Sequence, residues 1–91
     1  MYKLIFTRTY LKREEKFLKR HPELIERYKK VLRLLEINPA HPSLRLHKLK
    51  GKFCGKYAIS ITSSYRIVLA FAVTEKGIVL LDIGSHDDVY G

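Results

Sequence analysis

The apolar residues change their spacing part-way along this chain, and that change limits the folds the chain can adopt. Between residues 8 and 37 they recur at the helical period, with Leu24, Tyr28 and Leu35 on one stripe. Between residues 56 and 83 they alternate or run continuously, as they do in β-strands. A helical front part followed by a strand-rich part predicts an α+β fold, with helices packed on one sheet.

Two helices are predicted, over residues 8–20 and 22–37. His21-Pro22 separates them, because proline is accepted in the first turn of a helix and clashes in its interior. Asn38-Pro39 ends the second helix. The two helices should form a hairpin with one shared apolar seam. The residues of the first helix that we expect to face inward are Tyr10, Leu11, Phe17 and Leu18.

Strands are predicted on both sides of the helical hairpin, and the last three should form an antiparallel meander. The resulting order is β-α-α-β-β-β: a helical hairpin packed on a small, largely antiparallel sheet, in one domain of residues 1–91. The pattern does not indicate where the first strand joins the sheet. The tail, residues 84–91, looks too short for a further element. The predicted strands cover residues 2–6, 56–62, 65–73 and 78–83.

Positive charge is concentrated in the front part of the chain. Residues 1–56 hold sixteen lysines and arginines against five acids, a net +11, whereas the remaining residues have a net charge of −2. This asymmetry points to a nucleic acid or an acidic protein as partner. The longest apolar run is far below the roughly 20 residues of a membrane span, and Cys54 is the only cysteine. We therefore expect a cytoplasmic protein without membrane association.

The connection over residues 38–55 becomes strongly basic in its second half. Cations with an interleaved aromatic ring suit a path for single-stranded RNA, because phosphates pair with the cations and bases stack on the ring. A solvated loop is the simpler interpretation of the same residues. The candidate RNA-binding residues are Arg45, Lys48, Lys50, Lys52, Phe53 and Lys56.

Cleaving RNA without a metal needs a base, an acid and a cation around one phosphate, and histidine suits both proton transfers. His47 lies in the basic connection and His86 in the tail, so these two are the candidates. His21 and His41 each precede a proline and are interpreted as a helix cap and a loop residue. The sequence contains no HxH, HExxH or CxxC pair, so we predict no metal site and no cofactor.

Arg66 begins an otherwise apolar strand and is one of two cations after residue 56. An arginine projecting from a sheet needs a partner, either a structural carboxylate such as Asp82 or a bound phosphate. Tyr90, in the tail, could stack on a base or orient a proton, or it could close the edge of the core. The residues alone leave these alternatives open.

Three segments resemble the RelE/ParE superfamily of toxins, and most of all its YafQ branch. They are LHKLKG (46–51), YRIVLAF (65–71) and IGSHDDVY (83–90), in the order and spacing of that family. The resemblance implies a microbial RNase-like fold that enters the ribosomal A site and cleaves the mRNA there. The partner it implies is a cognate antitoxin, acidic at least locally, that folds across the basic surface in a toxin–antitoxin hetero-oligomer.

The resemblance also implies roles for particular positions. His86 matches the tail histidine of YafQ-like toxins, and Tyr90 matches the aromatic residue that closes their motif. His47 matches the histidine of their LHxLxG segment. Arg66 matches the phosphate-contacting arginine of the RelE and YoeB branches. Together these four residues, His86, His47, Arg66 and Tyr90, are the predicted catalytic set.

This chain departs from the family at three positions. YafQ-like members carry a further histidine and an acid where this sequence has Ser60 and Ser64, and RelE uses lysines where it has Ala58 and Ser60. The resemblance thus implies a ribosome-dependent endoribonuclease with a reduced acid–base set. The alternatives are a ParE-like toxin that inhibits DNA gyrase by binding, and a basic RNA-binding protein without activity.

Overall fold

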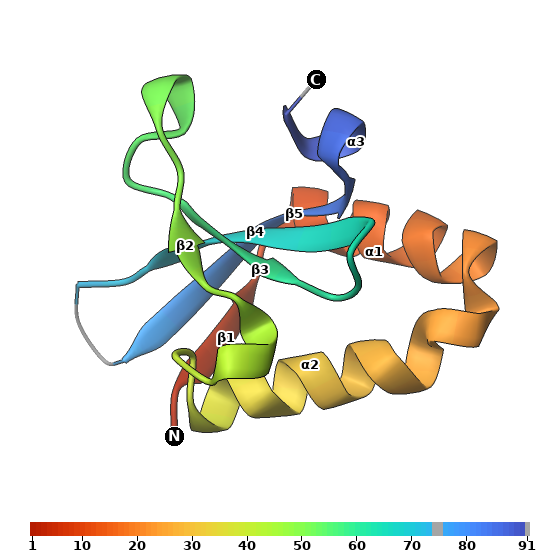
Figure 1. The fold of residues 1–91 in the computed structure, drawn as a ribbon, viewed down its shortest axis with the longest axis horizontal. Helices are drawn as coiled ribbons and strands as arrows, with labels where there is room; N and C mark the ends of the chain where they lie inside the picture. Colours follow the sequence, from red (N-terminus) through yellow and green to blue (C-terminus); the bar gives the residue numbers. More distant parts are fainter. Residues whose placement is uncertain (74–75, 91) are drawn as a thin grey trace.

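The computed structural model describes residues 1–73 and 76–90. The helices are α1 (Arg8–Arg20), α2 (Ile25–Ile37) and the one-turn α3 (His86–Tyr90) (Figure 1). Short 3₁₀ turns cover Pro22–Leu24 (η1), Pro42–Leu44 (η2) and Gly51–Phe53 (η3). The strands are β1 (Lys3–Phe6), β2 (His47–Lys48), β3 (Tyr57–Ser60), β4 (Tyr65–Phe71) and β5 (Gly77–Ser85).

The five strands form one mixed sheet in the order β1-β5-β4-β3-β2. The predicted antiparallel meander is confirmed, because β4 pairs with both β3 and β5 in antiparallel register. β1 is the strand whose place the pattern did not indicate, and it lies parallel to β5 at the sheet edge. A parallel pair needs a long crossover, and here the helical hairpin and the meander lie between the two strands.

The predicted helices are confirmed, with the first turn of the second one wound as η1. Thr7 is the residue that caps α1, because its hydroxyl accepts a hydrogen bond from the Tyr10 amide at 3.2 Å. The expectation that Leu11 faces inward is wrong, since this residue is 48% exposed. Tyr10 and Phe17 occupy the inward stripe, and Leu11 lies about 100° around the helix from Tyr10.

Two segments predicted to be irregular contain regular elements. The connection carries β2, which pairs with β3 through His47 opposite Ala58 and Lys48 opposite Tyr57. The tail continues β5 to Ser85 and then forms α3, so the expectation of no further element there is wrong. Two residue pairs and one helical turn are too short to produce a detectable period. The predicted turn at residues 75–77 includes Glu75, which lies outside the described residues.

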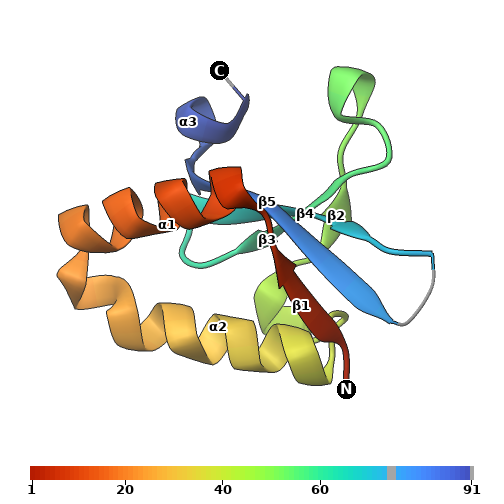
Figure 2. The ribbon, with the colours of Figure 1, turned by 180° about the vertical axis from the view of Figure 1, so that it is seen from behind.

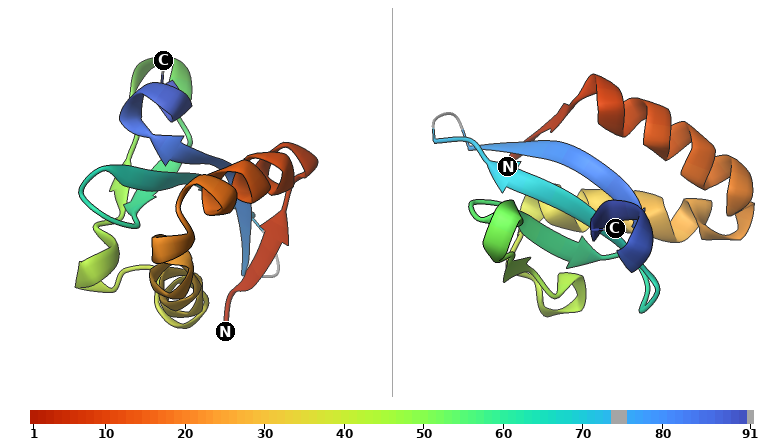
Figure 3. Two further views of the ribbon diagram at one scale, coloured as in Figure 1. Left: turned by 90° about the vertical axis from the view of Figure 1, so that its right-hand side faces the viewer. Right: turned by 90° about the horizontal axis from the view of Figure 1, so that it is seen from above.

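The sheet is buried on both faces near its centre. One face packs on the helical hairpin, where Tyr10, Leu35 and Ile67 are fully buried in the main core (Figure 2). On the other face, Val68 is buried but lies outside that cluster, as does Val89 of α3. α3 and the segment between β2 and β3 both project on the side of the sheet away from α2 (Figure 3). A second, smaller layer therefore stands over β3, β4 and the end of β5.

Candidate active site

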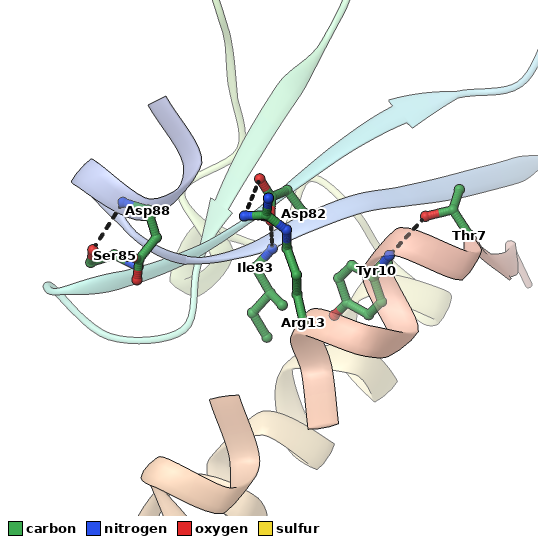
Figure 4. A network of polar contacts seen from close by, with 7 residues as sticks. All are labelled: Thr7, Tyr10, Arg13, Asp82, Ile83, Ser85 and Asp88. Atoms are coloured by element: carbon green, nitrogen blue, oxygen red, sulfur yellow. Dashed lines mark hydrogen bonds and ion pairs between the residues drawn. The ribbon is translucent and has the colours of Figure 1, made fainter. Parts of the chain in front are cut away.

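Arg66 lies at the start of β4, opposite Ser60 of β3 and Gly84 of β5. Its Nε is buried and, among the described residues, has no hydrogen-bond partner. Asp82, named from the sequence as a possible structural partner, instead pairs with Arg13 of α1 at 3.3 Å (Figure 4). The described part of the chain therefore supplies no carboxylate to this guanidinium, which leaves its charge available to an anionic ligand.

Tyr90 is the residue around which the predicted site gathers. The Cζ atom of Arg66 lies 5.7 Å from the centroid of the Tyr90 ring, within the range of a cation–π contact. The His86 ring lies 4.6 Å from the same ring, because residues four apart share one face of α3. The Tyr90 hydroxyl is buried and lacks a partner within the described residues. Arg66 and His86 thus both contact the Tyr90 ring.

The basic arm, defined here as residues 45–56, reaches this cluster through one aromatic residue. Phe53 lies 5.4 Å from the Tyr90 ring in an edge-on contact. The ammonium groups of Lys52 and Lys56 lie 5.4 and 5.6 Å from the Phe53 ring. In Figure 1 the arm and α3 stand as two projections above the sheet. The arm therefore places an aromatic ring against Tyr90, with two cations over the arm's own ring.

The remaining cations of the arm lie outside this contact group. Lys48 and Lys50 are exposed, on β2 and immediately before η3. Arg45 lies at the base of the arm, where it lines a small pocket together with Arg27 and Ser60. Its backbone is left-handed, with a φ of 53°. The predicted RNA-binding set therefore divides between the tip of the arm and its base.

His47 lies further from the cluster than the other predicted site residues. It is on β2, which β3 separates from β4, so its backbone is about 10 Å across the sheet from β4. Its pairing with Ala58 places it on the same sheet face as Arg66, because Ala58 and Ser60 are two residues apart on β3. Its Nδ1 lies 3.0 Å from the Arg45 carbonyl oxygen. No contact between described residues joins His47 to His86.

The other two histidines have structural surroundings. The His21 ring packs against Phe17 and Tyr65 at 4.8 and 4.6 Å. The His41 Nδ1 accepts a hydrogen bond from the Ser43 amide at 3.1 Å and so caps η2. Both interpretations from sequence hold in outline, although His21 makes no side-chain cap bond and His41 does. Neither histidine contacts Arg66 or Tyr90 among the described residues.

A second basic feature was not predicted from the sequence. A groove of about 660 Å³ runs between α1 and the end of β5, and it reaches α3 at Asp88. The signal was present as cations spaced four residues apart along the exposed side of the first helix. The cations that line this groove are Lys12, Arg13, Lys16 and Arg20.

The described residues contain no cluster of three or more histidine, cysteine or acidic side chains that could hold a metal. None of the helices is both long and apolar enough to cross a membrane. The chemistry available at the site is that of an exposed imidazole and a guanidinium. The His86 side chain is 67% exposed, so a ligand in solvent can reach it.

No family model matches the sequence, and no curated protein matches it significantly. Solved structures do match along the whole chain. YafQ from E. coli strain BL21(DE3) superimposes with a TM-score of 0.82 and 17% identity, covering all of both chains. The chain has the RelE/ParE toxin fold. The resemblance drawn from the three sequence segments is therefore confirmed at the level of the fold.

Two further structures extend the range of chains that share the RelE/ParE fold. A YoeB/ParE toxin from Agrobacterium tumefaciens has a TM-score of 0.75 and 20% identity, covering 92% of this chain and 98% of that one. A chain of the E. coli DinJ-YafQ toxin–antitoxin complex has a TM-score of 0.80 and 20% identity, covering 99% and 98%. The fold thus occurs both alone and in a complex of toxin with antitoxin.

Proposed function

We propose that this chain is the toxin of a type II toxin–antitoxin system and acts as a ribosome-dependent endoribonuclease on mRNA. The observation that carries the proposal is the convergence of Arg66 and His86 on the Tyr90 ring, with distances of 5.7 and 4.6 Å. A guanidinium without a carboxylate partner and an accessible imidazole on the same ring supply the cation and one of the two proton-transfer groups that cleavage of a phosphodiester needs.

In the proposed reaction the 2′-hydroxyl of one nucleotide attacks the adjacent phosphorus, and the bond from phosphorus to the 5′-oxygen breaks. One of His86 and His47 takes the 2′-hydroxyl proton, and the other gives a proton to the leaving 5′-oxygen. Arg66 offsets the charge that builds on the phosphoryl oxygens. Tyr90 stacks on the nucleotide or orients it. The products are a 2′,3′-cyclic phosphate and a 5′-hydroxyl, and the proton balance needs no metal or cofactor.

The basic arm would guide the substrate in this proposal. Lys48, Lys50 and Lys52 would neutralise phosphates, and Phe53 would offer a face to an unstacked base. Phe53 already contacts Tyr90 at 5.4 Å, so a base on either ring lies close to the proposed scissile phosphate. Ser60, where the family carries a histidine, offers no proton transfer near neutral pH. We therefore expect slow turnover relative to toxins that carry that histidine.

The proposed partner is an antitoxin, acidic at least locally, that covers the basic surface in the cytoplasm. Support comes from the DinJ-YafQ complex, in which a chain of the same fold is bound to an antitoxin. The net charge of +9 favours an acidic partner, because such a partner gains affinity and association rate from charge complementarity.

The test is to express the chain from a tightly controlled promoter and map new 5′ ends on cellular mRNA. General acid–base catalysis contributes about 10²–10⁴-fold, so His86→Ala should abolish detectable cleavage. Arg66→Ala should do the same by removing charge stabilisation. His41→Ala is the matched control and should cleave like the wild type, since its ring only caps η2.

Retention of mRNA cleavage by a folded His86→Ala variant would contradict the catalytic assignment. Growth arrest without new 5′ ends, relieved by a gyrase resistant to ParE-type toxins, would instead support the gyrase-binding alternative. RNA binding without cleavage or growth arrest would support a passive RNA-binding protein.

A further inference from the structure

α3 is a helix of one turn that carries both His86 and Tyr90. A helix this short does not persist in water without help, because nucleation is unfavourable and few backbone hydrogen bonds form. The interactions that hold α3 in place therefore decide where these two rings lie. Besides the contacts of Tyr90 with Arg66 and Phe53, they include three residues that the proposed mechanism does not use, which are the buried Val89 and the pair of Ser85 and Asp88.

Ser85 and Asp88 hold the start of α3 by a reciprocal pair of hydrogen bonds. The Ser85 amide donates to Asp88 Oδ2 at 3.1 Å, and the Asp88 amide donates to Ser85 Oγ at 3.2 Å. This is a capping box, in which the residue before the helix and the residue three positions later satisfy each other's free amide. Figure 4 shows the bond between the Ser85 hydroxyl and the Asp88 amide at the end of β5.

Gly84 lets the strand approach this box closely. Its φ is +153°, and a Cβ atom added there would lie 2.7 Å from the Asp88 Cβ and 2.9 Å from Oδ2. A side chain at this position would therefore displace Asp88. Gly84 is also the cross-strand neighbour of Arg66. The point where α3 is clamped to the sheet thus lies directly beside the arginine of the site.

The clamp, together with the buried Val89, restricts the rotation of α3 about its own axis. Residues 86 and 90 are four apart and share a face, whereas the Asp88 side chain faces elsewhere. With Asp88 held at Ser85, the shared face is directed so that Tyr90 reaches Arg66 and His86 packs on Tyr90. Loss of the clamp would loosen this orientation without altering the core, because Asp88 is exposed while the buried Val89 still holds α3 against the sheet.

We propose that Asp88 is a positioning residue, which together with Ser85 orients α3 and thereby places His86 and Tyr90 against Arg66. This inference rests on the proposed function and extends it to residues that touch no substrate. Hydrogen bonds from Ser85 lower the pKa of the Asp88 carboxyl, so it is a charged, good acceptor at neutral pH. Its charge faces Arg13 and Arg20 across the α1 groove.

The test compares four variants of the full chain: Asp88→Ala, Asp88→Asn, Asp88→Glu and Ser85→Thr. The first readout is cleavage of mRNA on purified ribosomes. The second is the proton NMR spectrum of the assigned His86 ring, whose C–H signals are shifted by the neighbouring Tyr90 ring. Asp88→Ala should slow cleavage about tenfold, as expected for the loss of a cap, and move the His86 signals toward those of a histidine without a neighbouring aromatic ring.

The conservative variants separate positioning from charge. Glutamate is common at this place of a capping box and threonine at its start, so Asp88→Glu and Ser85→Thr should restore both readouts. Asp88→Asn keeps an acceptor oxygen without the charge, and it should retain most activity. All four variants should remain folded, because the core is unchanged and the loss of one cap costs only a small part of the stability of a domain.

The inference and the proposed function fail in different ways. If the wild type cleaves RNA and Asp88→Ala leaves either readout unchanged, the positioning role is wrong. Equal losses in Asp88→Ala and Asp88→Glu would also overturn it. If the wild type cleaves no RNA, the proposed function fails, and the His86 signals alone decide whether Asp88 orients α3.

Discussion

The Tyr28 hydroxyl occupies the middle of a buried chain of hydrogen bonds between α1 and α2. It lies 2.6 Å from the Tyr10 hydroxyl and donates to the carboxylate of Glu14. Because its single proton is used on Glu14, the Tyr10 hydroxyl must donate to it. Tyr10 and Tyr28 are 0% and 3% exposed, so water cannot replace either partner. The donors of this hydrogen-bond chain therefore follow one direction: Tyr10 donates to Tyr28, and Tyr28 donates to Glu14.

This direction predicts unequal effects for two similar substitutions. Tyr28→Phe leaves the Tyr10 hydroxyl buried without an acceptor, which lowers the free energy of unfolding by about 1–3 kcal/mol. It also removes a hydrogen bond to a carboxylate that is partly open to water, so we expect a total loss of about 2–4 kcal/mol. Tyr10→Phe removes only the first donor and leaves Tyr28 bonded to Glu14. Its expected loss is about 1 kcal/mol.

The assay is urea unfolding followed by circular dichroism, with every variant in a His86→Ala background so that cells tolerate expression. The double variant Tyr10→Phe/Tyr28→Phe should lose less than the sum of the single losses, because phenylalanine at position 10 removes the unpaired hydroxyl. A larger loss for Tyr10→Phe than for Tyr28→Phe would refute the direction of the chain. Strict additivity would refute the shared hydrogen bond.

Three further predictions concern stability and partner binding. Burial raises the pKa of both Tyr10 and Tyr28 above the ordinary value of about 10. Their contribution to the free energy of unfolding is therefore present below pH 10 and lost as the pH rises above it. The urea midpoint should fall above pH 10, and less steeply in Tyr28→Phe. Leu35 lies in the fully buried core, so Leu35→Ala should lower the free energy of unfolding by about 2–5 kcal/mol. An equal loss for Leu11→Ala, at an exposed position, would contradict the observed packing. The affinity of the antitoxin complex, measured by calorimetry, should fall from low to high salt, and an unchanged affinity would indicate apolar contacts instead.

The helices and the meander could be predicted because their signals are local. The helical period around Tyr28 and the prolines that flank that stretch need no knowledge of the rest of the chain. The convergence of Arg66 with the tail also followed from sequence, since a hairpin brings the start of one strand beside the end of the next. The observed register, with Arg66 opposite Gly84, has this form.

Features that depend on distant partners could not be predicted in the same way. Arg13 and Asp82 are 69 residues apart, and their ion pair is what leaves Arg66 without that carboxylate. The position of β1 beside β5 and of β2 beside β3 likewise depends on packing across the molecule. A four-residue strand presents the same pattern at either edge of a sheet.

The sequence therefore predicted the residues of the site but not all of their contacts. Local patterns identified the residue types that transfer at phosphorus requires, and strand order brought Arg66 and His86 to one end of the sheet. The contact of both with Tyr90, and the distance of His47 from them, depend on the orientation of α3 and on the length of β2. Those two features arise from a cap and two residue pairs. The cap and the two residue pairs each contribute little free energy, and they form only after the sheet has folded. No periodicity in the sequence therefore predicts them.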